Sequence, residues 1–184
     1  MNVSTRLDRR FRDAAARDGL LDVAYDFADS PVGRLLVAVS EAGVCRISFD
    51  PEPERELDAL ARLHGRRVLR SAPPLDGVRR ELDEYFDQRR TTFDLSVDVA
   101  GLPAFQQLVL AELARVPYGE VATYGGLAAK IGKPRAARAV GGALNRNPIP
   151  IVLPCHRVVG ASGKLVGYAG GLERKRALLT LEGR

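Results

Sequence analysis

The fold and the chemistry expected of this chain depend most on residues 135–158, which read RAARAVGGALNRNPIPIVLPCHRV. Cys155 and His156 are adjacent here, in a chain that has only two cysteines and two histidines. Only a small fraction of a free thiol is ionised at neutral pH, so a nucleophilic cysteine needs a base, a nearby cation or a helix N-terminus. His156 and Arg157 are available. Because adjacent side chains point in different directions, we expect His156 to reach Cys155 through a water or a bend.

A structural interpretation of Cys155 competes with the catalytic one. Free cysteine is often buried as a small apolar residue, and the neighbouring run Ile149–Leu153 is typical of a core. A Cys-His dipeptide alone therefore leaves both interpretations open.

The residues before this motif predict a helix-turn-helix. Thr123 is a candidate N-cap for a short helix through Ala129, residues 131–134 form a turn, and a second helix runs from Arg135 to about Leu144. Alanine and glycine dominate the second helix and leave Arg138 as its long side chain. A helix this slim can approach a nucleic-acid groove closely or pack tightly against another helix, and composition does not decide between them.

The first half of the chain predicts a smaller α/β arrangement. Strands at 35–39 and 44–49 flank a turn at 40–43 and form a β-hairpin. Cys45, inside the hairpin, is expected to be structural, and His64 to lie at a helix end rather than bind a ligand. The other expected elements are helices at 6–21, 54–63, 75–88 and 104–115, a short strand at 93–95, and a domain boundary at 96–101.

Composition and charge indicate the kind of partner. The chain has 184 residues, of which 46% are hydrophobic, enough for one or two small cores. Residues 1–100 carry 16 Lys and Arg against 19 Asp and Glu, a net −3, whereas residues 101–184 carry 12 against 4, a net +8. The second half is therefore the expected surface for a polyanion, although a solvated basic surface would have the same charge. With no signal-like segment, bilayer-length apolar run or disulfide framework, we expect a reduced, cytoplasmic protein.

Four motifs, in this order along the chain, resemble those of the O6-alkylguanine-DNA alkyltransferases, also called methylated-DNA–protein-cysteine methyltransferases. They are Arg135–Leu144, Asn147–Pro150, Pro154–Val158 and Gly167–Gly171. The similarity is close from about Phe105 to Glu182 and looser back to about Tyr25. It implies an α+β fold with a ribonuclease-H-like α/β domain at 23–98 and a mostly helical domain at 99–184, which carries the helix-turn-helix and the cysteine loop. Residues 1–22 are an N-terminal extension outside the similarity.

The resemblance also implies a reaction and the residues that perform it. Members of this family flip O6-alkylguanine, and also O4-alkylthymine, out of duplex DNA and transfer the alkyl group irreversibly to a cysteine, here Cys155. The implied proton relay runs from Glu182 through His156 and a water to Cys155. Arg138 would fill the place of the flipped nucleotide, while Tyr124 crowds the adjacent phosphate. The remaining implied roles are DNA contact at Ala137 and Gly141, base contact at Tyr168, Val158 and Ala169, and a structural hinge at Asn147.

The resemblance implies a double-stranded DNA partner bound through the minor groove, a monomeric protein and no cofactor. A zinc site found in some relatives is not expected, because Cys45 and His64 are too few ligands for a structural metal. Three positions depart from the pattern of many relatives. Ala169 stands where some have serine, and Leu110 and Ala177 where many bacterial members have tryptophan.

Three other functions are also compatible with parts of the sequence. Alkyltransferase-like proteins recognise lesions without chemistry, but they lack the cysteine that this chain keeps. A Cys-His hydrolase would turn over and would have no use for the small-residue helix. A transcription factor is the weakest alternative, because a single arginine reads few base edges.

Overall fold

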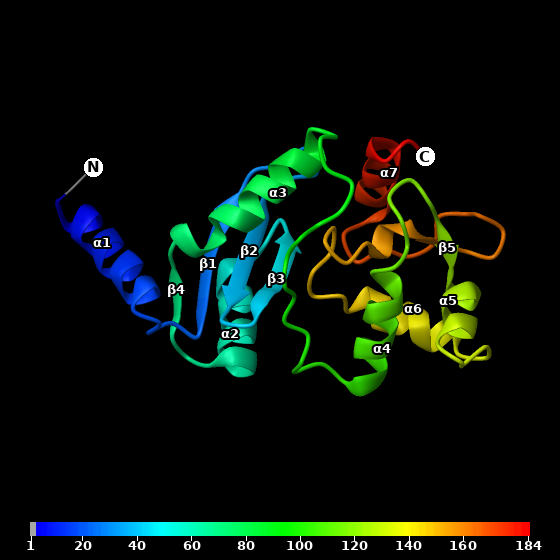
Figure 1. Ribbon diagram of the computed structural model, residues 1–184, viewed down its shortest axis with the longest axis horizontal. Helices are drawn as coiled ribbons and strands as arrows, with labels where there is room; N and C mark the ends of the chain where they lie inside the picture. The colour runs from blue at the N-terminus through cyan, green and yellow to red at the C-terminus, as the bar shows by residue number, and fades with distance from the viewer. Residues whose placement is uncertain (1–2) are drawn as a thin grey trace. The chain divides into compact units, whose positions relative to one another are not determined.

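The computed structural model describes residues 3–184 and divides the chain into two compact units (Figure 1). Unit 1 consists of the chain up to Asp87 together with Asp94–Asp98, and unit 2 of Gln88–Phe93 and Val99–Arg184. The first two residues of the expected N-terminal extension lie outside the described residues. No helix among residues 3–184 is long and apolar enough to cross a membrane.

Unit 1 is built on a four-stranded sheet in the order β3-β2-β1-β4. Its strands are β1 (Val23–Ala28), β2 (Leu35–Ser40), β3 (Gly43–Phe49) and β4 (Val68–Arg70). The antiparallel pair β2-β3 is the predicted hairpin, which is confirmed; β1 pairs antiparallel with β2 and parallel with β4. Gly43 is required at the hairpin turn, because its φ is +133° and a Cβ there would lie 2.3 Å from the Ser96 carbonyl oxygen.

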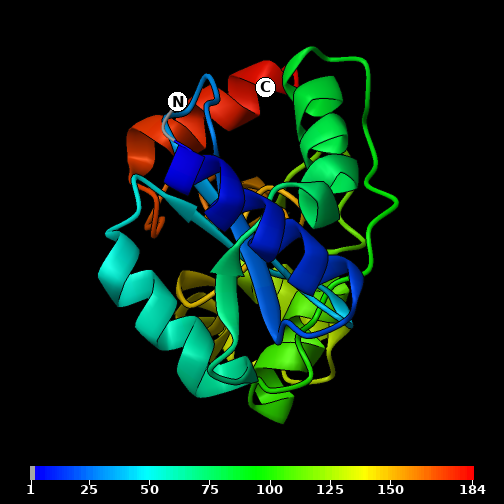
Figure 2. The same ribbon diagram turned by 90° about the vertical axis from the view of Figure 1, so that its left-hand side faces the viewer.

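Helices cover both faces of this sheet (Figures 1 and 2). On one face, Leu60 of α2 (Pro53–His64) packs in a cluster with Val23, Leu36, Ala38 and Cys45. On the other face, Arg79 of α3 (Asp76–Phe86), which follows the 3-10 turn η1 (Pro73–Leu75), donates to the Asp26 carboxylate at 2.6 Å. Helix α1 (Val3–Arg17) lies beside the β4 edge, where Asp13 accepts a hydrogen bond from Ser71 at 2.9 Å.

The strand predicted at 93–95 is wrong, because those residues have no strand pairing. The main chain joins the sheet slightly later, through a single parallel bridge between Val44 and Val97. Val44 donates to the Ser96 carbonyl at 2.9 Å and accepts from the Asp98 amide at 2.8 Å. Local β propensity favours a strand at 93–95, but pairing depends on which residues meet β3.

Unit 2 contains the predicted helix-turn-helix, whose first helix is capped as expected. The Thr123 hydroxyl accepts from the Gly126 amide at 3.0 Å at the start of α5 (Tyr124–Lys130), and α6 (Ala137–Asn145) follows the turn. Helix α4 (Ala104–Leu113) packs against both. The other elements of unit 2 are β5 (Ala122–Thr123), the 3-10 turn η2 (Cys155–Arg157), β6 (Val158–Val159) and α7 (Leu172–Leu181). Because β5 and β6 pair in parallel, the residues just before β5 lie beside the cysteine turn, and the start of α5 lies beside Gly160.

Candidate active site

Cys155 begins the tight turn η2 and is buried, with 7% of its surface exposed. Its amide donates to the Leu153 carbonyl at 2.8 Å, which closes the bend after Pro154. Four residues earlier, Ile151 has φ +75°, a conformation that is strained for a β-branched residue. Ile151 is fully buried, so the surrounding packing holds this strained path of the chain toward the cysteine.

Asn147 braces the turn between α6 and Cys155. Its side-chain amide donates to the Leu153 carbonyl at 2.8 Å and to the Cys155 sulfur at 3.1 Å, and its carbonyl oxygen accepts from the Ile149 amide at 3.0 Å. An asparagine side chain suits this position because it has both donors and an acceptor. The residue expected to be a hinge thus also contacts the sulfur directly.

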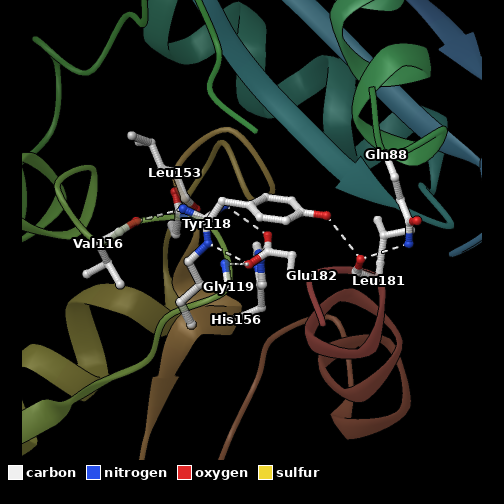
Figure 3. A network of polar contacts seen from close by, with 10 residues as sticks. Gln88, Val116, Tyr118, Gly119, Leu153, His156, Leu181 and Glu182 are labelled. Atoms are coloured by element: carbon white, nitrogen blue, oxygen red, sulfur yellow. Dashed lines mark hydrogen bonds and ion pairs between the residues drawn. The ribbon is translucent and has the colours of Figure 1, made fainter. Parts of the chain in front are cut away.

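Behind the cysteine, Glu182 joins two consecutive residues of the turn (Figure 3). His156 Nε2 lies 2.8 Å from one carboxylate oxygen, and Arg157 donates to both oxygens at 2.8 and 2.9 Å. The third nitrogen of the Arg157 guanidinium group donates to the Val116 carbonyl at 2.7 Å. The side chains of His156, Arg157 and Glu182 are all buried. An unpaired charge would be costly there, and each of the three has a partner.

This network fixes the tautomer of His156. Two guanidinium bonds keep Glu182 ionised, and an ionised carboxylate only accepts hydrogen bonds, so the imidazole proton resides on Nε2. His156 Nδ1 then carries the lone pair, and this buried atom has no hydrogen-bond partner among the described residues. Burial lowers the pKa of His156, Glu182 opposes that shift, and Arg157 adds to it. The imidazole is therefore a neutral base at neutral pH.

A fully buried lysine lies on the other side of the site. Lys175 of α7 donates to the main-chain carbonyls of Val158, Val166 and Gly167 at 2.6, 3.1 and 3.2 Å. Its ammonium group also stabilises the ionised form of Cys155. Burial lowers the pKa of Lys175, and the three carbonyl acceptors satisfy all of its donors.

Cys155 borders a cavity of about 440 Å³ in unit 2. Several residues expected at the site line this cavity: Tyr124, Gly141, Cys155, Tyr168 and Ala169. The other lining residues are Gly142, Leu144, Asn145, Val166 and Gly167. The cavity falls within the size range of small-molecule sites, and a reactive thiol in its wall makes it a candidate active site.

The electrostatics keep the resting thiol neutral while preparing it to ionise. Burial raises the pKa of the Cys155 thiol, whereas the Asn147 amide, the Lys175 charge and the Tyr168 hydroxyl each favour the thiolate. Burial also raises the pKa of Tyr168, so its hydroxyl stays protonated and able to donate. The thiolate thus forms only when a base removes the proton.

Some of the expected site residues lie elsewhere. Ala137, Arg138 and Val158 are not among the described residues that line the cavity. Ala137 and Arg138 are in the first turn of α6, where Arg138 is exposed to solvent. Val158 is buried, and its carbonyl accepts the shortest of the Lys175 hydrogen bonds.

Lys175 was not identified as a site residue from the sequence, although a signal was present. It shares a helical face with Leu178, Leu179 and Glu182, at spacings of three, four and seven residues. A lysine within such an apolar stripe requires buried acceptors. Arg157 was one of two candidates for lowering the thiol pKa, but its guanidinium group binds Glu182.

Unit 1 holds the other cysteine and the other histidine. Cys45 is buried in the core, as expected for a structural residue. His64 is the last residue of α2, and its Nδ1 lies 3.4 Å from the Asp98 carboxylate. Among residues 3–184, no three His, Cys, Asp or Glu side chains are grouped so that they could hold a metal ion.

Comparison with known proteins covers both units. Residues 23–99 match the 6-O-methylguanine DNA methyltransferase ribonuclease-like domain, and residues 104–184 match the DNA binding domain of the same protein. The methylated-DNA–protein-cysteine methyltransferase of Methanosarcina barkeri is 43% identical over 158 residues, which are 86% of this chain and 96% of that protein. The constitutive enzyme of Bacillus subtilis is 39% identical over 159 residues, 86% of this chain and 94% of its own.

Solved structures of related proteins have a similar fold. The crystal structure of Mycobacterium tuberculosis OGT in complex with DNA aligns with a TM-score of 0.75 at 42% identity, covering 86% of this chain and 92% of that one. The O6-methylguanine-DNA methyltransferase of Pyrococcus kodakaraensis aligns with a TM-score of 0.62 at 30% identity, covering 88% and 99%. These structures confirm the predicted α+β class, and both relatives and family matches confirm the resemblance in the sequence. The chain belongs to the family of methylated-DNA–protein-cysteine methyltransferases.

Proposed function

We propose that this protein repairs DNA directly, by transferring the alkyl group of O6-alkylguanine to Cys155 once per molecule. The observation that carries the proposal is the position of the Cys155 sulfur. It borders a cavity of about 440 Å³, and the next residue of the turn, His156, forms a buried pair with Glu182. The family relatives are named for this activity.

The proton relay begins with the thiol. His156 Nδ1 accepts the Cys155 proton through a bridging water, and the imidazolium that forms is stabilised by Glu182, which already accepts from Nε2. Arg157 neutralises Glu182 in the resting state, so the imidazole is not protonated before it is needed. Asn147 and Lys175 then stabilise the thiolate.

The transfer step exchanges one bond for another. The thiolate electron pair attacks the alkyl carbon, the carbon–oxygen bond breaks, and its electrons return to the guanine, which takes up a proton. The Tyr168 hydroxyl borders the same cavity and remains protonated, so it is suited to donate a hydrogen bond to the leaving base. The product is a thioether. Because no step here cleaves a carbon–sulfur bond, each molecule acts once.

The DNA partner is proposed from the helix-turn-helix and the charge. Unit 2 contains all of residues 101–184, which carry a net charge of +8, and α6 presents an exposed Arg138 on a helix of small residues. We propose that this helix enters the minor groove with Ala137 and Gly141 near the backbone, and that Arg138 replaces a nucleotide flipped into the cavity. O4-alkylthymine is proposed as a second substrate of the same pocket.

A stoichiometry experiment tests the proposal. Duplex DNA carrying O6-methylguanine, labelled in the methyl group, is added in excess over the protein, and the label is located by peptide mass spectrometry. We expect about one label per active molecule, all on Cys155, and none in Cys155→Ser. Label that stays on bound DNA would identify a non-catalytic lesion-recognition protein instead, and repeated turnover would identify a hydrolase. Either result contradicts the proposal.

A further inference from the structure

Two donors from different helices hold the same carbonyl at the edge of the cavity. The hydroxyl of Tyr124, the first residue of α5, donates to the Val166 carbonyl at 3.0 Å. Lys175 of α7 donates to the same oxygen at 3.1 Å. A carbonyl oxygen has two lone pairs and can accept both bonds. Val166 and the three residues after it all line the cavity.

The loop that these donors hold has little rigidity of its own. Gly163, Gly167 and Gly170 lie within it or beside it, and Gly167 has φ +46°, so the chain here depends on contacts for its order. Residues 166–169 have no strand or helix structure. The loop nevertheless carries Tyr168, whose hydroxyl interacts with the Cys155 side chain.

Tyr124 is also fixed on its other sides. Its ring borders the cavity and lies against α6, where a Cβ added to Gly141 would be 3.7 Å from the ring. The Lys175 ammonium lies 6.0 Å from the ring centroid, at the distance of a cation–π contact. The ring is therefore held between α6 and α7, with its hydroxyl directed at the loop.

We infer that Tyr124 is a positioning residue for the loop 166–169, which it holds beside Cys155 before any DNA is bound. The inference rests on the proposed function, because the loop matters as a wall of the base pocket. It goes beyond the phosphate contact implied for Tyr124, which requires DNA. A tether to the Val166 carbonyl acts equally on a free alkylated base, which has no phosphate and needs no flipping.

Amide hydrogen exchange tests the tether in the protein alone. Tyr124→Phe removes the hydroxyl and keeps the ring, so we expect the amides of residues 166–169 to exchange roughly two- to tenfold faster, the effect of losing one hydrogen bond. Tyr25→Phe, in the sheet of unit 1, is the matched control and should leave these rates unchanged. Wild-type exchange rates in Tyr124→Phe would overturn the inference.

Reaction with the free base O6-methylguanine separates the two roles of Tyr124. In Tyr124→Phe we expect the half-saturating concentration of free base to rise roughly two- to tenfold, with a smaller change in the limiting rate of Cys155 methylation. A defect seen only with duplex DNA would show that Tyr124 acts on DNA alone and would also overturn the inference. If wild-type protein is methylated by neither substrate, the proposed function fails, while hydrogen exchange still decides the tether.

Discussion

Cys45 and Cys155 are both free and both buried, with 4% and 7% of their surfaces exposed, yet the charged side chain that acts most strongly on each thiol has the opposite sign: Asp98 for Cys45 and Lys175 for Cys155. Around Cys45, burial and the Asp98 carboxylate together raise the thiol pKa to about 12. Around Cys155, burial also raises the pKa, but an amide, a hydroxyl and an ammonium group oppose it. The comparison shows that burial alone does not separate a structural thiol from a reactive one; the polarity of the contacting groups does.

The two thiols also differ in what lies beside them. Cys45 packs against Val23, Leu36 and Leu60 in the core of unit 1. Cys155 borders an open cavity and is followed by a histidine whose free nitrogen is available as a base. A reactive thiol needs both a route for its proton and room for the electrophile.

The largest expected effect comes from substituting each of the two cysteines in turn. Cys155→Ser should lose methyl transfer from O6-methylguanine DNA completely, because a hydroxyl is far less acidic and less nucleophilic than a thiol. Cys45→Ala should still take up about one label per molecule, since Cys45 is buried in the apolar core of unit 1. Intact mass spectrometry after incubation with the modified duplex measures both. Methylation of Cys45 in either variant would break the distinction between the two thiols.

The next largest effect should come from the carboxylate behind His156. Glu182→Gln removes the negative charge that stabilises the imidazolium, so methyl transfer should slow by roughly 100- to 10,000-fold, the usual contribution of a general base. It also leaves the buried Arg157 without its ion pair, which should lower the free energy of unfolding by about 3–5 kcal/mol. Single-turnover rates and denaturant unfolding measure the two effects.

Glu112→Gln is the matched control for that variant. Glu112 of α4 is also buried and pairs with Arg115 at 2.8 Å, but it has no part in the cysteine network. Its removal should cost stability without slowing transfer. Glu182→Gln reacting as fast as Glu112→Gln would mean that the imidazole needs no charged partner.

The elements predicted correctly from the sequence are those that local pattern determines. The hairpin at β2-β3, the cap at Thr123 and the helix-turn-helix depend on residues close together in the chain, and all are confirmed. Strand β4 was not predicted, because it has only three residues and is ordered by pairing with β1. Strand propensity is weak evidence in so short a segment.

In the site, too, features that depend on neighbouring residues were predicted, whereas contacts between distant residues were not. The motif around Cys155 predicts a nucleophile and its histidine, but the network depends on distant pairs such as Arg157 with Glu182 and Tyr124 with Val166. These partners are separated by 25 and 42 residues. Residue spacing carries no information on such contacts, so the pairing of Glu182 with the Arg157 cation and the binding of three main-chain carbonyls by Lys175 are seen only in the fold.

A smaller, more general effect concerns stability at high pH. The pKa of Cys45 rises in the folded protein from its ordinary value of 9.0 to about 12, so the unfolded chain loses this proton first as the pH rises. Below pH 9 the protonated Cys45 makes its full contribution to the free energy of unfolding. Above pH 9 the free energy of unfolding should fall by about 1.4 kcal/mol per pH unit. Denaturant unfolding of the wild type and Cys45→Ala between pH 8 and pH 10.5 measures this; parallel curves would contradict it.

The smallest expected effects have opposite signs at the two thiols. Removing the sulfur's amide donor in Asn147→Ala should raise the pKa of Cys155 further, because the thiolate loses a hydrogen bond. Removing a negative charge in Asp98→Asn should lower the pKa of Cys45, because the carboxylate no longer opposes ionisation. The ultraviolet absorbance of the thiolate, followed against pH, measures each shift, with Cys45→Ala as background for the first variant and Cys155→Ser for the second. Shifts of the same sign would mean that both variants act by loosening the fold, and that neighbouring polarity does not distinguish the two cysteines.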